Sequence, residues 1–144
     1  MGMNYFLAAL SQSQIDQIAK DPAQADSIVD AVPGDLKADV ESAWDALRAL
    51  FDGAGFDCGA FVPEALWNGC FLASPQEARA ESERLGAIDR GRLPAALADI
   101  EGSELYHFSA WAEAPDALFA MFARLRGFYE RAAERGLDVV HYAA

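Results

Sequence analysis

The sequence predicts one α+β domain over residues 1–144, in which a small sheet contains strands from both ends of the chain and is covered by helices. Short apolar segments at residues 4–10 and 138–143 predict the two terminal strands. Apolar residues at helical spacing over residues 35–51 and 116–135 predict the two helices that cover the sheet. Hydrophobic residues make up 53% of the sequence, which suits one core and excludes a disordered chain.

The N-terminal strand is followed by two short helices. Ser11 and Gln14 form a capping-box pattern, so a helix is expected to begin directly after the strand. A second helix is expected to begin at Asp21 and Pro22, with Asp21 as the N-cap and Pro22 at the first helical position. The dipeptide Pro33-Gly34 ends this second helix.

The helix expected over residues 35–51 has an apolar face and an acidic face. The apolar face consists of Val40, Ala43, Trp44, Leu47, Leu50 and Phe51, and Gly53 provides a left-handed cap. The acidic face carries Asp35, Asp39, Glu41 and Asp45. Like charges four residues apart on a helix are mildly destabilising. One interpretation is a solvated surface of an acidic protein, and the alternative is a docking face for a basic partner.

Residues 54–73 show no regular period but contain four large aromatic residues and several turn signals. A loop this long and apolar must pack against the domain, and such loops often carry function. Trp67, beside Asn68-Gly69, is interpreted first as a core anchor and alternatively as an exposed contact residue. Phe56 and Trp67 are therefore the second candidate pair for binding a partner.

The C-terminal half is expected to contain three helices and two extended segments. Ser74-Pro75 begins a helix that runs to about Leu85, because Ser74 and Glu77 again form a capping box. A short helix is expected over residues 92–100, and residues 104–111 are expected to be extended. The helix over residues 116–135 then ends at Gly136, before the terminal strand.

The chain is strongly acidic, with a net charge of -12 and a pI of about 4.4. Residues 1–64 contain 11 acidic and 3 basic residues, so -8 of this charge lies in the N-terminal half. Nucleic acid and anionic membrane surfaces are disfavoured as ligands, because both require a basic patch. A basic protein partner, by contrast, would be attracted by the field.

No metal or cofactor is expected. Cys58 and Cys70 form no CxxC pair, and His107 and His141 are distant from both in the sequence. Two free thiols in a reducing cytoplasm are the expectation. The apolar N-terminal segment lacks a basic flank and is too short for a signal peptide, and Phe6 stands where a myristoylation signal following Gly2 requires Ser or Thr.

No recognised catalytic motif occurs in the sequence, and we expect a non-enzymatic role while leaving the question open. His107 follows Glu104 closely and could act as a general base, although such a histidine is more often a core or interface residue. His141 is interpreted in the same way. An alternative function, a small enzyme or a small-ligand sensor, would use a pocket around Tyr106, His107 and Trp111.

Several motifs together resemble the YfbM-like family, domain of unknown function 1877. They are Met1–Met3 before a strand, Ala43–Leu50, Trp67–Gly69, Ser74–Glu77, Tyr106–Trp111 and Phe128–Gly136. The family usually has a GPxR-like segment before the Ser74 helix start, and here Gly69–Ala73 leads straight to that residue. If a family pocket depends on the missing segment, the chain lacks that pocket. The resemblance covers nearly the whole chain and implies an α+β fold without an established activity.

The favoured function is a non-catalytic protein-binding module. Its sharpest form is an immunity protein that neutralises a basic toxin by occlusion, which the resemblance implies because some relatives lie near genes for secreted toxins. The partner-binding residues expected are Asp35, Asp39, Glu41, Asp45, Phe56 and Trp67. The acidic composition and the absence of catalytic motifs both favour this hypothesis.

Overall fold

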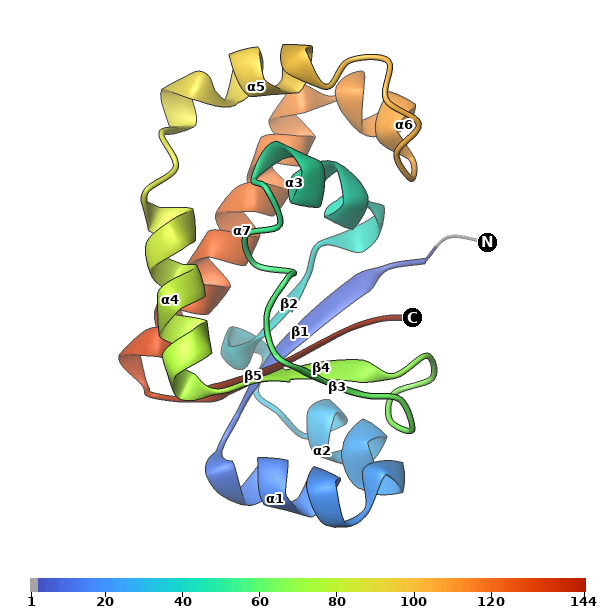
Figure 1. Cartoon of the computed structure of the whole chain (residues 1–144), viewed down its shortest axis with the longest axis vertical. Coiled ribbons are helices and arrows are strands. Elements are labelled where there is room, and N and C mark those ends of the chain that lie inside the picture. The colour runs from blue at the N-terminus through green and yellow to red at the C-terminus, as the bar shows by residue number, and fades with distance from the viewer. Residues whose placement is uncertain (1–2) are drawn as a thin grey trace.

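A computed structural model describes residues 3–144, so Met1 and Gly2 of the motif at the start of the chain lie outside the described residues. Five antiparallel strands form one sheet in the order β2-β1-β5-β4-β3 (Figure 1). The strands are β1 (Tyr5–Leu10), β2 (Lys37–Asp39), β3 (Ala60–Val62), β4 (Cys70–Ala73) and β5 (Asp138–Ala143). Both terminal strands belong to the sheet, as predicted, and β1 and β5 pair with each other along their whole length.

Helices cover both faces of this sheet. The helices are α1 (Gln12–Lys20), α2 (Ala25–Asp30), α3 (Trp44–Leu50), α4 (Pro75–Gly86), α5 (Leu93–Asp99), α6 (Phe108–Ala112) and α7 (Pro115–Glu134). The first two lie on one face, and the other five lie on the opposite face or beyond its end (Figure 1). None of the helices in residues 3–144 has the length and hydropathy needed to cross a bilayer.

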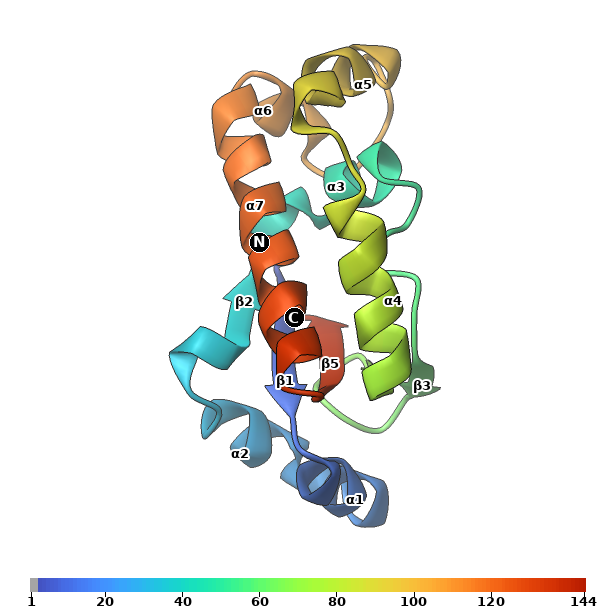
Figure 2. The same cartoon turned by 90° about the vertical axis from the view of Figure 1, so that its left-hand side faces the viewer.

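The main core lies between the sheet and the pair formed by α4 and α7, which run side by side (Figure 2). Phe122, Leu125, Phe128 and Tyr129 of α7 are fully buried there, as the helical spacing predicts. Each such side chain contributes roughly 1.5–3 kcal/mol when it leaves water. A smaller core on the other face joins Ile18 of α1 and Val29 of α2 to the sheet.

The predicted helix starts at Ser11 and Ser74 are confirmed. Each serine side chain accepts a hydrogen bond from the amide three residues on, and the side chain at that position, Gln14 or Glu77, accepts from the serine amide. Asp21 likewise accepts from the amide of Ala23. Local hydrogen bonding of this kind depends on a few adjacent residues, and so the sequence predicts it well.

The single helix expected over residues 35–51 is wrong. Residues 37–39 form the edge strand β2, which pairs with Phe6 to Ala8 of β1, and only Trp44–Leu50 is α-helical. The physical reason is an alternation of inward and outward side chains, with Ala38 and Val40 buried and Lys37 and Asp39 partly exposed. This two-residue period extends the sheet, whereas a helix would leave the β1 edge unpaired.

Two further segments differ from the prediction. The loop over residues 54–73 contains the β3–β4 hairpin, whose strands of three and four residues are too short for a periodic signal. The extended segment expected at 104–111 is instead a turn followed by α6. Its aromatic residues indicated a strand, but the β preference of aromatic residues depends on the packing available to them.

Candidate functional site

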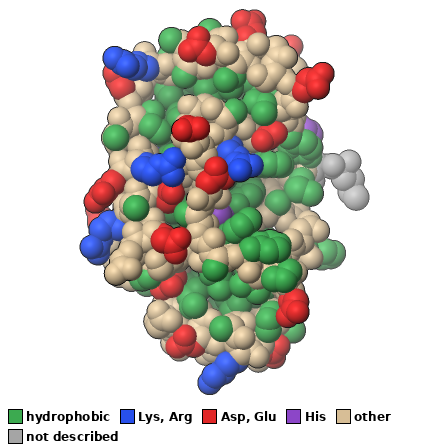
Figure 3. Space-filling model, in the orientation of Figure 1, with side chains coloured by type: hydrophobic (Ala, Val, Ile, Leu, Met, Phe, Trp, Pro, Cys, Tyr) green, Lys and Arg blue, Asp and Glu red, His purple; other side chains and the backbone are tan. Residues whose placement is uncertain are grey.

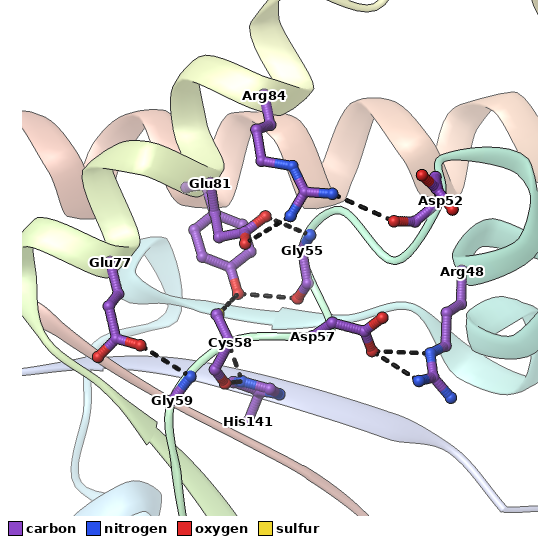
Figure 4. A network of polar contacts seen from close by, with 11 residues as sticks. Arg48, Asp52, Gly55, Asp57, Cys58, Gly59, Glu77, Glu81, Arg84 and His141 are labelled. Carbon is purple, nitrogen blue, oxygen red and sulfur yellow. Dashed lines mark hydrogen bonds and ion pairs between the residues drawn. The ribbon is translucent and has the colours of Figure 1, made fainter.

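The Gly53–Gly59 loop is fixed by polar side chains from α4, α7 and β5, most of which are buried (Figure 4). Glu81 of α4 is only 4% exposed, and one of its carboxylate oxygens accepts a hydrogen bond from the amide of Gly55 at 2.8 Å. Its other oxygen contacts the guanidinium of Arg84 at 3.0 Å. Glu77 accepts from the amide of Gly59 at 3.1 Å. The first turns of α4 therefore position this loop through its backbone.

Tyr129 and His141 fix the same loop from the other side. The Tyr129 hydroxyl donates to the carbonyl of Gly55 at 2.8 Å. The Nε2 of His141 lies 2.8 Å from the carbonyl of Cys58, and its Nδ1 lies 2.6 Å from the hydroxyl of Tyr5. A carbonyl oxygen can only accept, so Nε2 carries the proton, and Nδ1 accepts from Tyr5. The interpretation of His141 as a core residue with satisfied nitrogens is confirmed.

The proximity of Cys58 to His141 does not make a catalytic dyad. The sulfur is 3.7 Å from Nε2, but that nitrogen already donates to a carbonyl and has no lone pair to accept the thiol proton. Burial lowers the pKa of His141 to about 4, which keeps the ring neutral. Burial likewise raises the pKa of Cys58 to about 11. Both shifts oppose a thiolate–imidazolium pair.

Cys58 and Cys70 are both free thiols, and we predict that neither reacts readily in the folded protein. Burial raises the pKa of each to about 11, so only about 0.1% of each would be thiolate at pH 8. Iodoacetamide at pH 8 should therefore modify the native protein slowly and both thiols rapidly after denaturation. Rapid modification of one native thiol, or fewer than two thiols in the denatured chain, would contradict this.

Six rings form a continuous series across one face of the molecule, which we call the aromatic row. Its members, in spatial order, are Phe61, Phe71, His141, Tyr5, Trp44 and Tyr106. Neighbouring ring centroids are 5.1, 5.2, 5.8, 6.1 and 5.4 Å apart, the range in which aromatic pairs attract. Apolar side chains gather over this region of the surface (Figure 3).

A cavity of about 210 Å³, the aromatic pocket, opens within the aromatic row. Its walls are Tyr5, Trp44, Arg48, Phe56, Asp57 and Phe71. Arg48 and Asp57 form an ion pair at 2.7 Å, in which both side chains are about half exposed. The Gly53–Gly59 loop supplies Phe56 and Asp57, so the buried polar contacts described above also position one wall of the pocket (Figure 4).

Trp67 lies at the tip of the β3–β4 hairpin and is 86% exposed. Its φ is +69°, and that of the preceding Leu66 is +50°, a left-handed conformation that bulky residues seldom adopt. Ala65 and Leu66 are buried in the smaller core and anchor the tip. Phe61, on the adjoining edge strand, is 54% exposed. The hairpin thus holds two large apolar side chains in water.

The four acidic residues expected on one helix face all have internal partners. Asp35 pairs with Arg135 at 3.1 Å, and Glu41 lies 3.8 Å from Arg124. The prediction that all four lie on one helix face is wrong, because they belong to several different short elements. The other two accept hydrogen bonds from the backbone, Asp39 from Glu41 and Asp45 from Tyr106.

The two residues expected as aromatic anchors lie in different environments. Phe56 is only 5% exposed and packs edge-on against Tyr5, so its assignment as an exposed anchor is corrected by its position in the core. For Trp67 the core position that we favoured is wrong, and the alternative of an exposed side chain is correct. Trp44, expected in the core, is half-buried and forms part of the aromatic row.

The alternative site at residues 106–111 does not converge on one cavity. His107 is exposed and lines a hollow of about 410 Å³ with Glu101 and Glu113, so of the two positions expected for it, in the core or at an interface, the core position is wrong. Tyr106 instead stacks near Trp44, and the indole of Trp111 donates to the hydroxyl of Ser42 at 3.0 Å. Over residues 3–144, no three His, Cys, Asp or Glu side chains are grouped so as to hold a metal ion.

Sequence reasoning did not identify Phe61, Phe71, Arg48 or Asp57 as site residues. The signals available were weak, because each contact joins elements far apart in the sequence. The pair Asn68-Gly69, interpreted only as a turn, is the one signal that could have indicated a hairpin. At Gly69 a Cβ atom would lie 2.6 Å from the ring of Phe61, so the absence of a side chain there is required for the packing of the exposed aromatic residues.

Two of three comparisons with known proteins found proteins similar to this chain. Residues 1–142 match the family model described as "Domain of unknown function (DUF1877)". The crystal structure of a protein of unknown function, YfbM from Escherichia coli, is similar with a TM-score of 0.68 over 99% of both chains and 18% sequence identity. No curated protein matches the sequence. At this identity the structural similarity concerns the fold alone.

Proposed function

The chain belongs to the DUF1877 family, and we propose that it acts as a non-catalytic protein-binding module. The observation that carries the proposal is Trp67, a bulky side chain that is 86% exposed at a left-handed backbone position. Two adjacent residues in this conformation cost on the order of 1 kcal/mol or more each. Strain of this kind concentrates at functional sites, and exposed tryptophans dominate many protein interfaces.

The binding surface that we propose combines the hairpin tip with the aromatic row. Phe61 and Trp67 would anchor a partner, and the half-buried rings of Phe71, Trp44 and Tyr106 would extend the contact. Exposed large apolar side chains of this kind on a charged protein are typical of an interaction site. The site chemistry favours binding over catalysis, because His141 is occupied in holding the carbonyl of Cys58 and burial raises the pKa of the Cys58 thiol.

The partner that we propose is a basic protein, in the sharpest form a toxin that this chain occludes as an immunity protein. The net charge of -12 supports this choice, since it attracts a cationic partner over several ångströms and accelerates encounter. Asp35, Asp39, Glu41 and Asp45 remain candidates for such steering even though each has an internal contact.

We predict that Trp67→Ala weakens partner binding by about 30-fold, mainly through faster dissociation, because a buried tryptophan anchor is worth about 2 kcal/mol. The partner is first identified by comparing proteins captured from the native cell with the wild-type chain and with the variant. Binding kinetics are then measured with the purified partner. Melting temperatures should agree, since the Trp67 side chain makes little contact with its own fold.

Two further variants complete this test. Arg92→Ala changes a side chain that is 88% exposed at the other end of the molecule, and it should bind as the wild type does. The quadruple variant D35N/D39N/E41Q/D45N should slow association at low salt and leave dissociation unchanged if these residues steer the partner. A purified partner that binds Trp67→Ala as tightly as the wild type would exclude the hairpin tip as the anchor.

A second candidate function, binding of a small ligand, is favoured by a hollow of about 530 Å³ between α2 and the β2 edge. Its floor includes the stacked rings of Phe6 and Tyr142, and its rim includes Lys37 and Arg124. The cations donate to backbone carbonyls, Lys37 to Asp30 and Arg124 to Asp39. A ligand held there would be insensitive to Trp67→Ala, which separates the two candidates.

A further inference from the structure

We propose that the aromatic pocket receives an arginine side chain of the partner protein, with Asp57 as its counter-charge. This inference rests on the proposed function and specifies the chemistry of the partner. Four aromatic rings line the pocket, namely Tyr5, Trp44, Phe56 and Phe71, beside one carboxylate. Aromatic faces attract cations, and the attraction increases when the cation leaves water. A carboxylate beside such rings adds direct pairing, because a guanidinium can donate two hydrogen bonds to its oxygens.

Arg48 shows that a guanidinium fits this position. Its Nε lies 2.8 Å and its second terminal nitrogen 2.7 Å from the same oxygen of Asp57, at the mouth of the pocket. Both side chains are about half exposed, at 52% and 45%. An ion pair in that environment contributes little to stability, so a partner arginine can replace Arg48 at Asp57 at low cost.

The pocket is preorganised, which reduces the entropy lost on binding. Phe56 and Asp57 lie in the Gly53–Gly59 loop, whose amides and carbonyls are held by Glu81, Tyr129 and His141 (Figure 4). The indole of Trp44 is fixed by its bond to the carbonyl of Met3 at 3.1 Å. Apart from Arg48, which must release Asp57, these walls therefore need not reorder when a side chain enters.

The dimensions and the charge both favour one side chain of a basic protein. A cavity of about 210 Å³ is smaller than the roughly 300–1,000 Å³ typical of pockets for whole small-molecule ligands. The aromatic row continues from the pocket to Phe61 on one side and to Tyr106 on the other, so a protein surface can seat around an inserted residue. The net charge of -12 adds long-range attraction for a cationic partner.

The experiment titrates ¹⁵N-labelled protein with N-acetyl-arginine methylamide and follows the indole N–H signal of Trp44 and the amide signal of Asp57. Saturable shifts with a dissociation constant in the millimolar range are expected, because one side chain buries little surface. The citrulline analogue has the same shape without the charge and should bind at least about fivefold more weakly.

Substitutions of the two members of the Arg48–Asp57 ion pair should change the affinity for the probe in opposite directions. Asp57→Asn should lower the affinity for the arginine probe about fivefold. Arg48→Met should raise this affinity about threefold, because it removes the internal competitor for Asp57 and keeps the apolar stem. Glu134→Gln is the matched control, since it removes one exposed negative charge from the end of α7 and should leave affinity unchanged. Melting curves confirm that each variant is folded.

Equal binding of the citrulline analogue, or unchanged affinity in both Asp57→Asn and Arg48→Met, would overturn the inference. The titration requires no partner, so its failure is distinct from that of the proposed function. If the probe does not bind but Trp67→Ala still weakens binding of the purified partner, the proposal of an arginine in the aromatic pocket is wrong and the proposed function stands. If the probe binds as described, Trp67→Ala should bind it equally well.

Discussion

Replacing Glu81 by alanine is expected to lower the free energy of unfolding by about 3 kcal/mol. The side chain is 4% exposed and bridges the amide of Gly55 and the guanidinium of Arg84. Its loss leaves a buried amide without an acceptor, which is costly in a low-dielectric environment, and it also removes the ion pair with the half-exposed Arg84. Urea denaturation of the variant and the wild type measures the difference.

Two variants on the same helix provide the controls for this prediction. Glu83→Ala removes an exposed carboxylate from α4 and should change stability by less than about 0.5 kcal/mol. Arg84→Ala removes only the partly exposed partner, at 46% exposure, and should cost about 1 kcal/mol. Amide hydrogen exchange at Gly55 and Gly59 should accelerate in Glu81→Ala beyond the global change. Equal stability of Glu81→Ala and Glu83→Ala would mean that the buried carboxylate does not hold the loop.

Acidification is expected to destabilise the protein through His141 by about 3 kcal/mol between pH 6.5 and pH 4. Burial lowers the pKa of this ring from 6.5 to about 4 in the folded state. Between these values the unfolded chain binds a proton that the folded chain does not, so stability rises with pH across the interval. The contribution is complete above pH 6.5 and is lost progressively as the pH falls towards 4.

The comparison with His141→Gln isolates this effect from the carboxylates. Glutamine does not titrate and can still donate to the carbonyl of Cys58 in place of Nε2. Urea unfolding at several pH values from 4 to 7 should give a steeper dependence for the wild type than for the variant. Parallel curves would show that the His141 ring titrates in the folded state as it does in the unfolded chain.

The fold class and most helices were predictable because their signals are local or periodic. The Ser11 and Ser74 caps depend on residues three positions apart, and the long α7 repeats its apolar face over several turns. The terminal strands were predictable as apolar runs. Their pairing with each other was not predicted, because no local pattern indicates which strands of a sheet are neighbours.

The division of residues 35–51 was not predicted because two periods overlap there. The apolar positions from Ala43 onward follow a helix, whereas Ala38 and Val40 alternate with polar residues as in a strand. A window that spans both regions averages them into one helix. The decisive quantity, the need of β1 for a neighbour at its free edge, depends on tertiary structure.

The candidate site was predicted only in part, for a similar reason. Trp67 stood out because an irregular, turn-rich segment surrounded it, and its exposure agrees with one of the two interpretations. The aromatic pocket joins residues from β1, α3, β4 and the Gly53–Gly59 loop. No local pattern indicates that Asp57 would meet Arg48 there, since that contact depends on how the loop is held by α4 and α7.

The central position of β5 has a consequence for biosynthesis. This strand lies between β1 and β4, so the sheet remains divided into separate pieces until residues 138–143 have left the ribosome. The first strand must wait, with its apolar side chains uncovered, for a partner more than a hundred residues away in the sequence. Pairing between strands so far apart in the sequence slows folding and prolongs the lifetime of aggregation-prone intermediates. The sheet of this protein can therefore be completed only at the end of synthesis.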